Sequence, residues 1–437
     1  MPGIAGTCVV YPLSVLYNRR FVRTLLLLLA VSVIACAQPR RDPIEYNPPP
    51  EIARKAVELR GALNALYFGG VAWDLCVLGL LLRARVGPRI RNAWASKTRS
   101  RFVERALTTA TILAILWAAD LPFDACRHWL GLRYGLSVHP WGPWFLDLIK
   151  ASLITLIPAV LLIVAMLAAA AQWPRRWWIC GWLLGVITMV AATYLAPLLF
   201  DPLFFEFKSL AATNPSLTTG LQKVASHAGF DVPQSRIYEM DASRKTRATN
   251  AYMTGFGDSR RIVIWDTSIQ ALTPPQVETV FAHELGHYAL NHIPISIAIG
   301  AAGLFAALWL LHAALSRAIR GERFGILGLQ DSGGLPLFFL ATLIVSFASE
   351  PLGNAYSRWQ EHQADIYELE AMHGLVPEAG RNSAEVTRKM AELDLEDPNP
   401  SAFIRFWRYS HPPSRERIRF AQRYDPWAQG ARPKYLR

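Results

Sequence analysis

Long apolar runs alternate with polar stretches along this chain. A membrane-spanning helix needs about 20 consecutive, mostly apolar residues. Runs that approach or exceed this length occur at residues 21–37, 63–82, 106–121, 148–171, 177–199, 293–315 and 335–349. The pattern predicts a mainly α, multi-pass membrane helical bundle with about seven spans, or six if the first segment is cleaved.

The first apolar run resembles a signal-peptide core as much as a spanning helix. It follows Arg19 and Arg20, and residues 33–36 read Val-Ile-Ala-Cys, a pattern similar to the cleavage box of a bacterial lipoprotein. Because that box is short, an uncleaved first helix is favoured over lipidation of Cys36. The box indicates a bacterial source and therefore a bacterial inner membrane.

The polar stretches set the expected domain boundaries. Within the polar stretch at 201–292, residues 235–240, 248–255 and 261–266 predict strands of a small β-sheet, and the glycine-rich turn at 255–258 joins the last two as a hairpin. The expected parts are a signal-like or first spanning segment at 1–38, an N-terminal membrane region at 39–200, a mostly polar domain at 201–292, two spans within 293–349 and the C-terminal part of that polar domain at 350–437.

Composition supports a membrane protein and argues against nucleic acid as a partner. Hydrophobic residues make up 52% of the chain and charged residues 18%, and mean hydropathy is +0.20. The net charge is +12, but many arginines flank apolar runs, where they anchor helix ends, and no nucleic-acid recognition motif accompanies them. The five cysteines contain no C-x-x-C pair, so neither a thiolate metal site nor a disulfide framework is expected.

A helix with the chemistry of a metal site is expected from Thr273 to about Asn291. Thr273 at the N-cap, Pro274 at the first helical position and Gln276 form a capping-box start. His283 and His287 are four residues apart, so both imidazoles project from one face and can bind one ion. Glu284 lies about 100° round the helix, where a base can take a proton from zinc-bound water.

A catalytic zinc ion wants a third protein ligand and one open position. Glu361 is the best candidate, with His362 as the rival ligand. Asp365 lies one helical turn after Glu361 and would accept a hydrogen bond from a ligand imidazole, fixing its tautomer.

Four segments together resemble the type I CAAX prenyl protease family of integral membrane zinc metallopeptidases, of the gluzincin type. They are His283-Glu-Leu-Gly-His287 with His292 five residues on, Asn250-Ala251-Tyr252, Glu361-His-Gln-Ala-Asp365, and Ser410-His411-Pro412-Pro413 leading to Arg417. The resemblance covers essentially the whole chain. It implies a gluzincin-like zinc domain and a bundle of helices that encloses a chamber within the membrane.

The resemblance also implies a role for each matched residue. His283, His287 and Glu361 would bind one Zn²⁺, Glu284 would be the catalytic base, and Asp365 and His292 would support the ligands. Asn250, Ala251 and Tyr252 would hold the substrate backbone, and His411 and Arg417 would stabilise the anionic intermediate or organise the site. Without the resemblance, Asn250 reads as a turn former at a strand edge and His411 as part of a helix N-cap region.

These observations predict a zinc endopeptidase that acts on peptide or protein substrates in or near the bilayer. Two substrate classes stay open: lipidated C-termini, as the resemblance implies, and damaged membrane or envelope proteins in a bacterium.

The orientation of the zinc site in the membrane is also open. The arginine-rich stretch at 83–105 predicts a cytoplasmic loop and an outward-facing zinc site, whereas eukaryotic members of the family have the site in the cytosol. The non-enzymatic alternative is an inactive membrane scaffold or transporter, and a purely structural zinc site is weaker because no cysteine is available.

Overall fold

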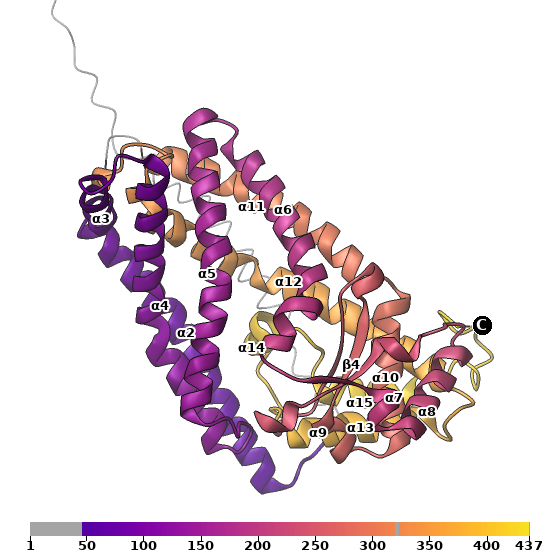
Figure 1. The fold of residues 1–437 in the computed structure, drawn as a ribbon. Coiled ribbons are helices and arrows are strands. Elements are labelled where there is room, and N and C mark those ends of the chain that lie inside the picture. Colours follow the sequence, from indigo (N-terminus) through magenta and orange to yellow (C-terminus); the bar gives the residue numbers. More distant parts are fainter. Residues whose placement is uncertain (1–45, 320–322, 437) are drawn as a thin grey trace, which may run out of the picture.

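Long helices form the body of the molecule, and a small sheet with shorter helices lies at one end of it (Figure 1). The computed structural model describes residues 46–319 and 323–436. Within these ranges, six helices are long and apolar enough to cross a bilayer: α2 (Pro50–Arg83), α4 (Arg101–Arg133), α5 (Trp141–Gln172), α6 (Trp177–Leu195) with its short continuation to Leu203, α11 (His292–Ala318) and α12 (Leu335–Met372).

Each of the six predicted spans after residue 38 lies within one of these helices. The multi-pass helical bundle is therefore confirmed. The predicted segment at 21–37 lies outside the described residues, so the count of seven spans stays a prediction.

The shorter helices surround the sheet or join the long helices. They are α3 (Val86–Ala95), α7 (Leu210–Thr213), α8 (Pro215–His227), α9 (Asp266–Ala271), α10 (Pro274–Ala289), α13 (Ala379–Leu393), α14 (Ala402–Arg408) and α15 (Ser414–Arg423). Helix α3 lies at the opposite end of the long helices from α10 and the sheet (Figure 1).

Four strands form the sheet in the order β1-β2-β4-β3. They are β1 (Phe207–Ser209), β2 (Ile237–Met240), β3 (Ala251–Thr254) and β4 (Arg261–Trp265). The predicted hairpin is confirmed: β3 pairs antiparallel with β4, and Gly255 and Gly257 adopt positive φ angles of 74° and 57° in the turn. β2 pairs parallel with β4, so β3 lies at the edge of the sheet.

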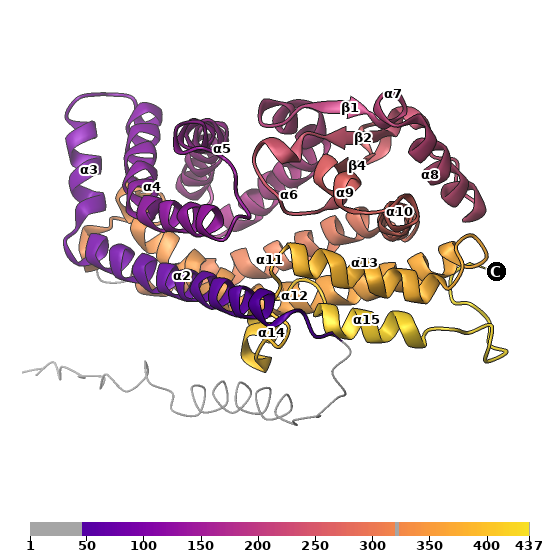
Figure 2. The same ribbon diagram turned by 90° about the horizontal axis from the view of Figure 1, so that it is seen from below.

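An apolar core joins the sheet to the helices that carry the site. Ile237 and Ile264 of the sheet pack with Phe281 and Leu285 of α10 and with Tyr367 of α12, and each of these side chains is buried. Seen from below, α12, α13 and α15 lie side by side (Figure 2). Helix α12 is unbroken from its apolar first half to its polar second half, so the boundary expected at 349/350 falls inside one helix.

Candidate active site

Helix α10 begins and ends where its sequence dictates. Thr273 and Gln276 form a capping box, and the Thr273 N–H donates to Oε1 of Gln276 at 3.1 Å. After Ala289 the chain turns at Asn291, whose φ of 53° is left-handed, and α11 starts at His292. Helix α10 therefore holds His283 and His287 on one face, and the turn at Asn291 brings His292, the first residue of α11, close to them.

Three side chains converge on one point from α10 and α12. Nε2 of His283 lies 3.1 Å from Oε2 of Glu361 and 3.3 Å from Nε2 of His287. One ligand atom from each of the three residues lies within 4.8 Å of the others. Two imidazole nitrogens and a carboxylate oxygen are the donor set of many catalytic zinc sites, so these residues fit such an ion.

The state of His287 suits metal binding. Burial, reinforced by His283, lowers the pKa of His287 to about 3, so the imidazole is neutral, the form that coordinates metals. Nδ1 of His292 lies 2.8 Å from Nδ1 of His287, and Nε2 of His292 lies 3.3 Å from Oε1 of Gln363. His292 therefore contacts the nitrogen of His287 that faces away from Glu361.

The opposite nitrogen of His283 faces a charged cluster. Oδ1 of Asp365 lies 3.2 Å from Nδ1 of His283, and Oε2 of Glu368 lies 3.5 Å from the same atom. Arg417 on α15 donates to Asp365 through Nη2 at 2.6 Å and through Nε at 3.1 Å. Burial would lower the pKa of Arg417, but the Asp365 carboxylate raises it, so the guanidinium stays charged.

Glu284 lies beside the convergence point and against the edge strand. Its Oε2 accepts a hydrogen bond from the Met253 N–H of β3 at 3.1 Å. Burial raises the pKa of Glu284 to about 7, near the value that suits a general base at neutral pH. A divalent cation bound next to it would lower that pKa.

The loop before α15 brings one more imidazole to the site. Nε2 of His411 lies 3.3 Å from Oε1 of Glu361, and the hydroxyl of Ser410 lies 2.9 Å from its Nδ1. The His411 side chain is exposed. It can therefore reach a substrate in the open part of the site.

A cavity of about 1,070 Å³ opens onto the three converging side chains and Glu284. Side chains of α2, α6 and α11 line it together with β3, α10 and α12, so it connects the long helices to the site. Every predicted site residue except Asp365 lines this cavity: Asn250, Ala251, Tyr252, His283, Glu284, His287, His292, Glu361, His411 and Arg417.

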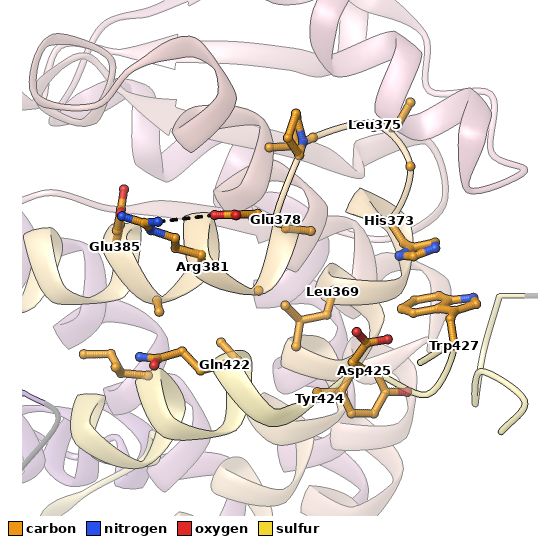
Figure 3. A pocket seen from close by; sticks show the side chains of 18 of the residues that line it. Leu369, His373, Leu375, Glu378, Arg381, Glu385, Gln422, Tyr424, Asp425 and Trp427 are labelled. Carbon is orange, nitrogen blue, oxygen red and sulfur yellow. Dashed lines mark hydrogen bonds and ion pairs between the residues drawn. The ribbon is translucent and has the colours of Figure 1, made fainter. Parts of the chain in front are cut away.

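A second cavity, of about 880 Å³, lies beside α13 and α15 (Figure 3). Its rim carries the ion pair of Arg381 with Glu378, and the His373 and Trp427 rings stack with centroids 3.5 Å apart. No predicted site residue lines it. The chemistry therefore belongs to the first cavity.

The two candidate third ligands, Glu361 and His362, have different surroundings in the structure. Glu361 is buried and faces both histidines, whereas the exposed His362 packs its ring against Phe420, with centroids 4.6 Å apart. Sequence reasoning missed Glu368 and Met253. Glu368 follows Glu361 by seven residues and Asp365 by three, so helical periodicity could have placed it on the same face; Met253 contributes only its backbone and leaves no signal in the sequence.

The fold and the site together define a membrane-embedded metallopeptidase, and comparisons with known proteins agree. The model of peptidase family M48 matches residues 211–425, and the model described as the CAAX prenyl protease N-terminal region with five membrane helices matches residues 55–206. The chain therefore belongs to the family of membrane metallopeptidases that these two models together describe.

Relatives cover most of the chain. The uncharacterized metalloprotease YhfN of Bacillus subtilis is 29% identical over 384 residues, which is 87% of this chain and 88% of that protein. CAAX prenyl protease 1 of Saccharomyces cerevisiae is 24% identical over 396 residues, covering 86% of this chain and 78% of the relative. These matches support a metallopeptidase over the scaffold or transporter alternative.

The crystal structure of S. mikatae Ste24p has the same fold. The TM-score is 0.74 at 20% sequence identity, and the match covers 88% of this chain and 92% of that one.

Proposed function

We propose that this chain is a zinc endopeptidase in which His283, His287 and Glu361 hold one Zn²⁺. The observation that carries the proposal is the convergence of these three side chains beside Glu284 and the edge strand β3. When bound, zinc would polarise the scissile carbonyl and make water a better nucleophile.

The residues of the chain would divide the remaining work. Glu284 takes the proton of the attacking water and passes it to the leaving amine. His411, which lies next to Glu361, donates a hydrogen bond to the oxygen that becomes negative in the transition state. Asp365 and Arg417 hold His283 in place from its other side.

The substrate would lie extended along β3. This strand is at the edge of the sheet and lines the cavity, and its backbone can pair with an added strand. Asn250 is fixed at the start of β3, because its N–H donates to Oγ of Ser268 at 2.8 Å and its carbonyl accepts from the Trp265 N–H at 3.1 Å. The Asn250-Ala251-Tyr252 segment would therefore hold the substrate backbone in register with Glu284.

Membrane-associated proteins would be the substrate class, because the long helices line the same cavity as the site. Lipidated C-termini and damaged envelope proteins both satisfy this description. Cleavage of one peptide with and without a prenyl group separates them: equal rates favour the envelope role, and cleavage of the prenylated form alone favours the lipidated one.

The site would face outward from a bacterial inner membrane. Helix α3, inside the arginine-rich stretch at 83–105, lies at the opposite end of the molecule from α10 (Figure 1). If this stretch is cytoplasmic, the site is on the other side. A cysteine introduced at Ser100 should react with a membrane-impermeant thiol reagent only after cells are opened; labelling in intact cells contradicts this orientation.

Glu284→Gln tests the chemistry, since it keeps the shape of the side chain and removes the base. The rate of cleaving a fluorogenic peptide should fall by about a hundred- to ten-thousand-fold. Zinc content in the same sample should not change. Glu278→Gln makes the same chemical change on α10 away from the ligands and should leave the rate intact. Near wild-type cleavage by Glu284→Gln would contradict the proposed role of Glu284.

A further inference from the structure

Glu368 is a buried carboxylate beside the metal ligands that neither the sequence motifs nor the proposed mechanism uses. It lies on α12, two turns after Glu361, and is 4% exposed. Oε2 lies 3.5 Å from Nδ1 of His283, while Oε1 has no hydrogen-bond partner among the described residues. A carboxylate in this position costs free energy unless another interaction offsets the cost.

Arg417 attracts both carboxylates, but it donates its printed hydrogen bonds to Asp365 and not to Glu368. Oδ1 of Asp365 accepts hydrogen bonds from both Nη2 and Nε of Arg417. The same oxygen lies 3.2 Å from Nδ1 of His283. Within residues 46–319 and 323–436, no arginine or lysine forms an ion pair with Glu368. Glu368 therefore keeps one carboxylate oxygen without a hydrogen bond among the described residues, and its printed contact is with Nδ1 of His283.

His283, Asp365 and Glu368 also have the spacing of a metal-binding group. However, Nη2 of Arg417 lies 3.4 Å from Nδ1 of His283 and 2.6 Å from Asp365. A guanidinium thus holds the place that a second cation would take. Glu368 is therefore placed to act through His283 on the ion that the other ring nitrogen, Nε2, would bind.

We propose that Glu368 is a positioning residue that, together with Asp365, accepts the Nδ1–H of His283 and adds the negative charge that retains the metal ion. The Nδ1–H tautomer leaves the lone pair of His283 on Nε2, the atom that faces Glu361 and His287. The added charge makes the imidazole a stronger ligand. This inference rests on the proposed zinc site.

Glu370 provides a matched control on the same helix. It is 2% exposed, like Glu368 a buried glutamate, but its Oε2 accepts the backbone N–H groups of Tyr435 and Leu436 at 2.7 and 2.9 Å. Its Oε1 accepts from the hydroxyl of Tyr424. Glu370 therefore anchors the C-terminal tail and has no contact with the metal ligands.

The experiment compares Glu368→Gln with Glu370→Gln in the full chain, purified in detergent. Zinc affinity is measured by competition with a chelating indicator, and thermal unfolding is measured on the metal-free protein. Glu368→Gln should lower zinc affinity about 10- to 100-fold, as loss of a supporting carboxylate does at other zinc sites, with a metal-free Tm at or above that of the wild type. Glu370→Gln should lower the metal-free Tm and leave zinc affinity nearly unchanged.

A third variant separates charge from shape. Glu368→Asp keeps the charge and should bind zinc more tightly than Glu368→Gln. Wild-type zinc affinity in Glu368→Gln would overturn the inference alone, as would a loss of affinity matched by a fall in metal-free Tm like that of Glu370→Gln. A wild-type protein that binds no zinc would overturn both the inference and the proposed function.

Discussion

The carboxylate of Glu284 accepts a hydrogen bond from the backbone N–H of Met253, with 3.1 Å between Oε2 and the nitrogen. This bond joins α10, which carries two of the proposed ligands, to β3, the edge strand of the sheet. Because both groups line the same cavity, a peptide paired with β3 would pass directly beside the proposed base. In the proposed mechanism, this one contact would relate the position of the base to that of the substrate.

The identity of the third ligand can be decided by metal content. Glu361→Ala should lose zinc, because it removes one of three converging donors. His362→Ala should keep zinc, because the His362 ring packs against Phe420. Metal analysis of both purified variants checks this. Full zinc occupancy in Glu361→Ala would show that the ligand assignment is wrong.

His411 should affect the reaction without affecting the metal. His411→Ala should lower kcat by about a hundred- to a thousand-fold, the usual effect of losing one donor to a developing oxyanion. Steady-state kinetics and metal analysis on the same sample measure both effects. Ser410→Ala removes only the hydroxyl next to Nδ1 of His411 and should have a smaller effect. Loss of zinc from His411→Ala would indicate a role in metal binding instead.

The glycine between the two histidines sets the distance between α10 and α12. A Cβ at Gly286 would lie 3.1 Å from Cβ of Tyr367 and 3.2 Å from Cα of Ala364. Gly286→Ala should push the two helices apart and weaken zinc binding. Overpacking should destabilise the fold by about 1–3 kcal/mol, which outweighs the gain of about 1 kcal/mol from the higher helix propensity of alanine.

Gly61→Ala on α2 is the matched control for this prediction, because nothing lies within 4 Å of the added Cβ. It should leave both zinc affinity and Tm unchanged or slightly improved. Equal zinc affinities in the two alanine variants would contradict the proposed constraint at Gly286.

Asp394 should make stability depend on pH. Burial raises its pKa from 3.8 to about 6, although the Thr249 N–H donates to Oδ1 at 2.9 Å. A raised folded pKa means that stability is fully present below about pH 4 and is lost as pH rises through about 6, by at most about 3 kcal/mol.

The measurement is thermal unfolding of the metal-free protein between pH 4 and 7. Asp394→Asn keeps an acceptor for Thr249 and should reduce the fall in Tm over this range. The Asp258 side chain is 97% exposed, so Asp258→Asn should show the same dependence of Tm on pH as the wild type. Identical profiles for Asp394→Asn and the wild type would rule out this source of pH dependence.

The sequence by itself determined the features that depend on near neighbours. Six apolar runs predicted the long helices, because a helix that crosses a bilayer satisfies its backbone hydrogen bonds within the segment. The Thr273–Gln276 capping box fixed the start of α10, and four-residue spacing placed His283 and His287 on one face. Gly255 and Gly257 marked the hairpin, because their left-handed φ angles are those that glycine adopts at no steric cost.

Only the tertiary structure decided which distant residues meet. Glu361 is separated from His283 by 78 positions and Arg417 by 134, and no local periodicity relates residues so far apart. The expected division at 349/350 followed the change from apolar to polar residues, but α12 continues through it. A helix keeps its internal hydrogen bonds whatever surrounds it, so the change of surroundings there does not end it. Packing of α10 against α12 then placed Glu368 against the far nitrogen of His283, and α15 brought Arg417 to the same nitrogen.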